Sequence, residues 1–149
     1  MTIKVFLCLL VLTINYQLAI AYLGIDLRFR DSILPSLLLS TIAFVSKEFF
    51  NTSSVLHTII IVFTCSLFLH IINKISLIFS IIGSLLSFIT LTMGSLLLAC
   101  PFLVHIGIKI SNETNGTNWI YLNIAELVIP LLILIILKHK KTSIVKAFG

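Results

Sequence analysis

The sequence predicts an all-α membrane protein: a polytopic transmembrane helix bundle of about five spans, forming a single domain over residues 1–149. Three observations predict it. Hydrophobic residues make up 59% of the chain and charged residues only 10%, which is too few to cover a soluble globule. The mean hydropathy is +1.21. The basic residues lie in the gaps between apolar runs, because a charge is costly at the bilayer centre but not at its interface.

The first apolar run, residues 3–23, is expected to be a retained transmembrane helix. A cleaved signal peptide is the alternative, with Lys4 as its positive end and Ala19-Ile20-Ala21 as a cleavage-like site. Against cleavage, only one basic residue precedes the apolar centre, and apolar character resumes after the site. We therefore count this run as the first span.

The second run, residues 32–46, is the shortest of the five. At about 1.5 Å per residue it reaches roughly 21 Å, which is less than the ~30 Å thickness of the hydrocarbon core. It crosses only if the charged and aromatic residues on either side lie at the interfaces. Pro35 is expected in its first turn, where a missing N–H costs little.

The third and fourth spans, residues 55–72 and 75–98, are separated only by Asn73-Lys74 and are expected to form a helical hairpin. Apolar character then continues to residue 110, which is too far for one helix and too short for two with a turn. Proline disfavours helix at the residue before it. Cys100-Pro101 therefore predicts a break, followed by an interfacial segment over residues 100–110.

The last span, residues 119–137, follows the most polar stretch and opens with interfacial Trp119 and Tyr121. A basic tail, residues 138–149, follows it. Because this positive charge lies beside an apolar span, the expected partners are the lipid bilayer and its anionic inner-leaflet lipids rather than nucleic acid. The lysines expected at the membrane surface are Lys138, Lys140, Lys141 and Lys146.

The distribution of basic residues predicts the N-terminus outside and the C-terminus inside. Five crossings place seven Lys and Arg residues inside and three outside, of ten in all. Without a crossing by the second run the split is six to four, so the positive-inside rule favours five. Three glycosylation triplets, at Asn51, Asn112 and Asn115, then lie outside. The composition, rich in Ile and Lys and poor in Ala, is typical of low-GC bacteria, which favours a multi-pass protein of the bacterial plasma membrane.

Glu126 is the one acidic residue inside a predicted span. Four residues later, Pro130 lacks the N–H that would bond to the Glu126 carbonyl, and Asn123 lies one turn earlier on the same face. One interpretation is a proton, cation or ligand site. The favoured one is a protonated glutamate in an interhelical hydrogen bond, because no second intramembrane acid or base is an obvious relay partner.

Small residues recur along the fourth span at three-, four- and seven-residue spacing and predict close packing of another helix. They are Ser76, Ser80, Gly83, Ser84, Ser87 and Gly94. The third span is the expected partner, and a second copy of the protein is the alternative. A polar notch in the first span, formed by Asn15, Tyr16 and Gln17, is expected to hydrogen-bond to other helices.

No catalytic motif appears in the sequence, and we expect no enzyme activity, catalytic residue, cofactor or metal. The three cysteines lie in apolar runs as free thiols. His57 and His70 are about 20 Å apart along one predicted helix, so they cannot share a metal ion.

The order of features resembles a known family. A first helix ending in Leu23-Gly24-Ile25 is followed by a charged connector, a short apolar run (SILPSLLLSTIAFV), a tight hairpin (LHIINKISLIFSII), a long span bearing Ser and Gly, a polar loop and a last helix with Pro130. This pattern is similar to the membrane-embedded sensor half of bacterial peptide-pheromone sensor histidine kinases of the accessory-gene-regulator type. It covers nearly the whole chain but contains no diagnostic motif.

Kinases of this family continue into a dimerisation region with a phospho-accepting histidine and an ATP-binding domain, whereas this chain ends at Gly149. The resemblance therefore implies a stand-alone or truncated sensor module that modulates a kinase by forming mixed dimers.

The leading functional hypothesis is a non-enzymatic, signal-sensing membrane protein, in which an outer ligand or partner meets the loops at residues 47–54 and 111–118. One alternative is a small transporter, or an accessory subunit of a membrane complex, that uses Glu126. Another is a membrane anchor whose basic tail docks a cytoplasmic partner.

Overall fold

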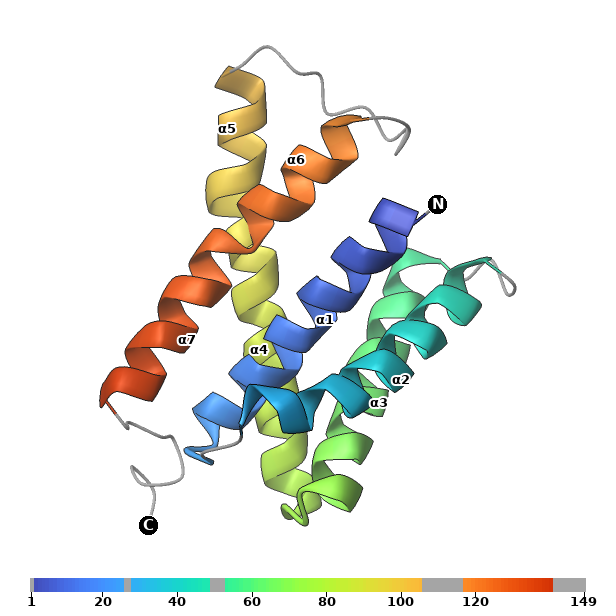
Figure 1. Ribbon diagram of the computed structural model, residues 1–149, viewed down its shortest axis with the longest axis vertical. Helices are drawn as coiled ribbons and strands as arrows, with labels where there is room; N and C mark the ends of the chain where they lie inside the picture. The colour runs from blue at the N-terminus through green and yellow to red at the C-terminus, as the bar shows by residue number, and fades with distance from the viewer. Residues whose placement is uncertain (1, 26–27, 49–52, 106–116, 141–149) are drawn as a thin grey trace.

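The computed structural model describes residues 2–25, 28–48, 53–105 and 117–140, and all regular secondary structure in these residues is helical (Figure 1). This confirms the all-α class. The helices are α1 (Thr2–Tyr22), α2 (Phe29–Glu48), α3 (Ser54–Ile72), α4 (Leu77–Gly94), η1 (Ser95–Ala99), α5 (Cys100–His105), α6 (Thr117–Glu126) and α7 (Val128–Lys140).

Four helical segments of the described chain are long and apolar enough to cross a membrane: α1, α2, α3, and α4 with its continuation into η1. The protein is therefore an integral membrane protein with several spans. The fifth predicted span is divided at Leu127 into α6 and α7, of 10 and 13 residues. Neither part reaches spanning length alone, but together they run the length of the bundle (Figure 1).

Successive long helices alternate in direction, and α6 and α7 both run in the same direction as α1 (Figure 1). The start of α1 and the end of α7 consequently lie at opposite ends of the bundle, as an odd number of passes requires.

α1 is the central helix of the bundle. In α1, 67% of the apolar stretch Val5–Tyr22 is buried, against 22–39% of the corresponding stretches of the other three spans, and every residue from position 11 to 21 is buried. α1 packs against α2, α4, α6 and α7. Leu12, Ala19 and Ile20 belong to the main hydrophobic core. Cleavage after Ala21 would remove this core, so the fold favours retention of the first helix.

α2 is longer than its apolar run predicts. It begins at Phe29 rather than at residue 32, and its 20 residues extend about 30 Å, enough to cross the hydrocarbon core. Pro35 lies inside α2 and not in its first turn, which corrects the prediction. The connector residues Arg30 and Asp31 are helical and their side chains are exposed, so the helix begins earlier without burying a charge.

The helical hairpin of α3 and α4 is confirmed, but its link is four residues long, 73–76, rather than two. Lys74 has a positive φ of 55°, which turns the chain, and Ser76 precedes α4 as its N-cap residue. The hydroxyl of Tyr16 donates to Asn73 Oδ1 at 2.6 Å. The link is thereby tied to the central helix.

The predicted break at Cys100-Pro101 is wrong. Helix continues from α4 through the π-helical segment η1 into α5, which ends at His105. A π-helical turn bonds each N–H to the carbonyl five residues back instead of four, so the hydrogen-bond register changes just before Pro101 and the helix passes the proline without ending. Residues 106–110 of the predicted interfacial segment lie outside the described residues.

Candidate functional site

The last span is interrupted beside Glu126. α6 ends at Glu126 and α7 begins at Val128. The N–H of Leu127 bonds to the carbonyl of Ile124, three residues back, at 3.2 Å. Pro130 has no N–H to offer the Glu126 carbonyl. The helix is therefore interrupted where the spacing of Glu126 and Pro130 predicts a kink.

Gly94 of α4 lies directly against this interruption. A Cβ atom added to Gly94 would overlap the carbonyl oxygen of Glu126 and lie 3.2 Å from Cδ of Pro130. The absence of a side chain at Gly94 is what lets α4 approach the backbone of α6 so closely. η1, which follows Gly94, also packs against α6. Two irregular helical segments thus lie side by side.

The small residues of α4 pack against more helices than the sequence predicts. A Cβ atom added to Gly83 would lie 3.1 Å from the carbonyl oxygen of Ala19 and 3.0 Å from Cδ1 of Leu23, both in or next to α1. The expectation of α3 as the main partner is corrected: α4 packs against α3, but equally against α1, with Gly94 facing α6. Of the other small residues, Ser76 is exposed. The remaining three are buried: Ser80, Ser84 and Ser87.

Glu126 and Asn123 lie one turn apart at the C-terminal end of α6. The side chain of Glu126 is half-buried, and no hydrogen bond or ion pair joins its carboxyl to another group within the described ranges. Asn123 lines a cavity together with Asn15 and His57, and Glu126 is not part of that lining.

A polar cluster, buried at two of its three residues, joins three helices near the other end of the bundle. Lys138 Nζ of α7 donates to Oε1 of Gln17 at 2.8 Å, and Nε2 of Gln17 donates to Ser32 Oγ at 2.7 Å. Gln17 and Ser32 are 0% exposed. Ser32 in turn donates to the carbonyl of Phe29 at 2.7 Å. We call Lys138, Gln17 and Ser32 the Lys138 cluster.

Lys138, which the sequence places at the membrane surface, has an exposed side chain whose ammonium also donates to Gln17. Its long aliphatic stem lets the charged group reach Gln17 while the rest of the side chain remains exposed. The side chain of Lys140, and Lys141 and Lys146 entirely, lie outside the described residues.

Two residues of the polar notch of α1 have partners outside α1: Gln17 bonds to Ser32 of α2, an interhelical bond as predicted, and Tyr16 bonds to Asn73 of the hairpin link. Asn15 is different. Its side chain is 2% exposed, and its Oδ1 atom has no hydrogen-bond partner.

The histidines take part in helix contacts. His57 Nδ1 is 2.8 Å from Ser46 Oγ, which joins α3 to α2. His70 Nδ1 is 2.7 Å from the carbonyl oxygen of Ile75 and so closes the hairpin link. Among the described residues, no group of three or more His, Cys, Asp and Glu is placed to hold a metal ion. The glycosylation triplets at Asn51, Asn112 and Asn115 lie outside those residues.

No protein-family model, no curated protein and no solved structure matches this chain. The fold and the sites define a polytopic α-helical membrane protein with one interrupted span and a polar cluster that joins three helices.

Proposed function

We propose that the protein is a non-enzymatic, signal-sensing membrane module. In this role, α5 and α6 bind an external ligand or partner. α7 then transmits the movement of α5 and α6 to the opposite end of the bundle. The observation that carries it is that α7 joins the interruption at Leu127 directly to the Lys138 cluster.

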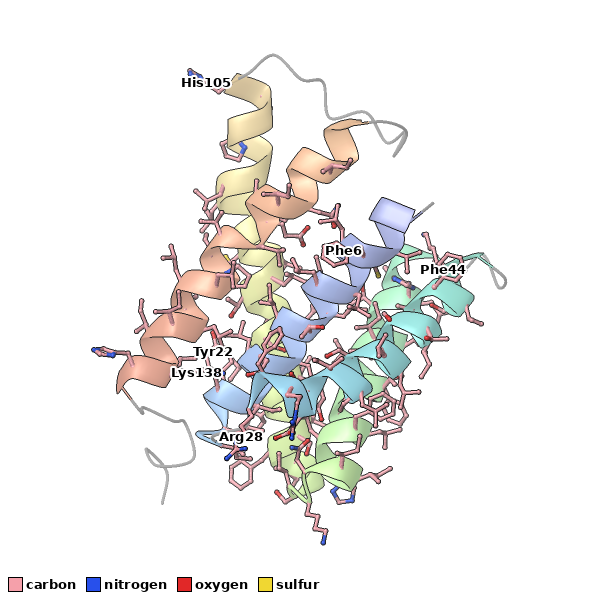
Figure 2. The ribbon with its side chains drawn as sticks, in the orientation of Figure 1. Phe6, Tyr22, Arg28, Phe44, His105 and Lys138 are labelled. Atoms are coloured by element: carbon pink, nitrogen blue, oxygen red, sulfur yellow. The ribbon has the colours of Figure 1, made fainter. Side chains whose placement is uncertain are left out.

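The end of the bundle that holds Arg28 and Lys138 is assigned to the cytoplasm, and the end that holds Phe6 and His105 to the outside (Figure 2). The excess of Lys and Arg at the first end supports this assignment through the positive-inside rule.

The shape of the outer end suits a receiving element. α5 and α6 extend beyond the ends of α1, α2 and α3 (Figure 1). At their base lie η1 and the interruption at Leu127. Irregular helical segments are common at functional sites, and rotation of one packed part against another about such segments is a known form of switching. We call α5 and α6 the outer arm.

A small transporter, or an accessory subunit, that uses Glu126 is the second candidate. An ionisable side chain at an interrupted span favours it, because such residues mark ion or substrate paths. The cavity lining does not include Glu126, which favours the sensing proposal over a transport path. The docking-tail alternative depends on residues 141–149, which the structure does not describe.

Movement of the outer arm is testable by double electron–electron resonance. Spin labels are placed at His105 and His139, the exposed ends of α5 and α7, in a chain whose native cysteines are replaced by alanine. We expect two distance populations, because the interruption between the labels permits two arrangements of the arm. Pro130→Ala restores an N–H for the Glu126 carbonyl and is expected to leave one population.

Pro35→Ala is the matched control, because Pro35 is also a buried proline within a helix but lies in α2, away from the arm. It should leave both populations unchanged. Glu126→Gln should also leave them unchanged in a sensor, whereas it abolishes ion or substrate flux in a transporter. A single distance population that Pro130→Ala does not alter would rule out the sensing proposal.

A further inference from the structure

The fourth transmembrane helix continues beyond the length that the bilayer requires. α4, η1 and α5 form one uninterrupted helical stretch of 18, 5 and 6 residues, which extends about 40 Å. α1, α2 and α3 have 21, 20 and 19 residues and extend about 30 Å each, which matches the ~30 Å hydrocarbon core. The additional length is at the outer end, where α5 rises past the start of α1 (Figure 1).

This additional length is apolar. The sequence has no Asp, Glu, Lys or Arg between Lys74 and Lys109, and α5 reads CPFLVH. Several side chains of η1 and α5 are nevertheless exposed: Leu96, Leu97, Leu98 and Val104. A contiguous exposed apolar surface of this kind marks a contact with a membrane or a partner rather than with water.

The exposed apolar face of α4 continues along η1 and α5. Its members recur at intervals of four and seven residues, as side chains on one face of a helix do: Leu85, Ile89, Met93, Leu97 and Val104. On α4, which is long and apolar enough to cross the membrane, this face contacts the acyl chains of the bilayer. Because the face continues without a polar residue at these positions, acyl chains are also the partner that fits η1 and α5.

The base of the outer arm has the structure that a change of tilt requires. A helix longer than the hydrocarbon core adapts by tilting or kinking, and helices kink at π-helical turns such as η1. η1 packs against α6, which ends at the interruption beside Leu127, so α5 and α6 can tilt together. An upright arm in a thin bilayer would expose apolar surface to water, which is unfavourable, whereas a thick bilayer covers that surface.

We propose that the partner of the outer arm is the acyl-chain region of the bilayer, and that bilayer thickness determines the tilt of the arm. The arm is upright in a thick bilayer and inclined in a thin one. This inference rests on the sensing proposal, because it names what the outer arm responds to. The two can fail separately, since two arrangements of the arm can exist without any dependence on thickness.

The test uses the full, cysteine-free chain in nanodiscs that hold one copy each, so that no second copy can cover the arm. The discs contain dimyristoleoyl, dioleoyl or dierucoyl phosphatidylcholine, which share a headgroup and increase in chain length in that order. Double electron–electron resonance measures the distance between labels at His105 and His139. An upright arm places His105 farther from His139, which lies at the opposite end of the bundle.

We expect the ratio of the longer to the shorter distance population to rise at least about tenfold from the shortest to the longest chain. A tenfold ratio corresponds to about 1.4 kcal/mol, which a modest cost per Å reaches over several Å of mismatch.

Val104→Asp is expected to abolish this dependence. A carboxylate favours water over hydrocarbon, so the arm should remain upright and the longer distance should dominate in all three bilayers. Val55→Asp is the matched control. Val55 is 72% exposed and Val104 is 65% exposed, and both lie at the outer end, but Val55 belongs to α3, whose length matches the bilayer. It should leave the dependence on chain length unchanged. Circular dichroism checks that both variants are helical.

The same population ratio in all three bilayers would overturn the inference, and so would an equal loss of the dependence in Val55→Asp and Val104→Asp. Two populations that respond to Pro130→Ala but not to chain length would overturn this inference alone and leave the sensing proposal standing. A single population that Pro130→Ala does not alter would overturn both.

Discussion

Gly94→Ala is expected to destabilise the bundle by about 2–3 kcal/mol, at the upper end of the usual cost of adding a methyl group to a packed core. The added Cβ would overlap the carbonyl oxygen of Glu126. Backbone cannot move aside as the end of a flexible side chain can, so α4 and α6 must separate. The measurement is unfolding of the purified chain by sodium dodecyl sulfate, followed by circular dichroism.

Gly83→Ala is the matched control. It makes the same chemical change in the same helix and gains the same helix propensity, about 1 kcal/mol. Its nearest neighbours are the end of the Leu23 side chain at 3.0 Å and the carbonyl oxygen of Ala19 at 3.1 Å, so a shift of a few tenths of an ångström makes room for the Cβ, whereas at Gly94 the Cβ would overlap backbone. We expect a loss at least about 1 kcal/mol smaller than for Gly94→Ala. Equal losses for the two variants would contradict the close approach of α4 to the interrupted span.

Lys138→Met is expected to lower stability by about 1–3 kcal/mol, the usual cost of a buried group left without its hydrogen-bond partner. The variant keeps the length and apolar stem of the side chain but removes the donor to Gln17 Oε1, which is fully buried. The same detergent unfolding measures the loss.

Lys74→Met is the control for this substitution. It removes a lysine at the same end of the bundle, in the exposed hairpin link, and should change stability by less than about 0.5 kcal/mol. The double variant Gln17→Leu with Lys138→Met should be less destabilised than the sum of the two single variants, because removing both partners leaves no orphaned acceptor between them. Strict additivity would show that the Lys138 cluster does not act as a unit.

The helices with sharp apolar limits are predictable from the sequence. The third span is expected at residues 55–72, and α3 runs Ser54–Ile72, because a long apolar run follows directly after a capping serine, Ser53. α2 is harder. Arg30 and Asp31 are charged, and the sequence assigns them to a connector, yet charged side chains at the end of a helix can extend into the interface while the backbone stays helical.

The effects of proline are only partly predictable. Pro130 is associated with an interruption and Pro101 is not, although the sequence predicts a break at Pro101 and one continuous span, with a single missing hydrogen bond, around Pro130. The difference lies in η1, the π-helical segment that precedes Pro101 and packs against α6. No local pattern in the sequence around Pro101 indicates that packing.

The polar contacts could be predicted by type but not by partner. Residues 15–17 indicate interhelical hydrogen bonds, but Gln17 and Lys138 are 121 positions apart, and only the bundle arrangement brings them together. The bundle arrangement also brings Gly94 of α4 against Glu126 of α6, which no local pattern in the sequence indicates. The cavity beside Asn15 depends on how five helices leave space between them, which no sequence periodicity describes.

Five crossings, with α6 and α7 as an interrupted fifth, are central to the sensing proposal, because the outer arm and the cytoplasmic end must lie on opposite sides of the membrane. The most direct measurement is labelling of single cysteines, placed at Thr2 or at Gly149 in the cysteine-free chain, with a membrane-impermeant maleimide. We expect Thr2→Cys to react in intact cells and Gly149→Cys to react only after permeabilisation. Reaction of both from the same side, or of Gly149→Cys alone in intact cells, would contradict this arrangement.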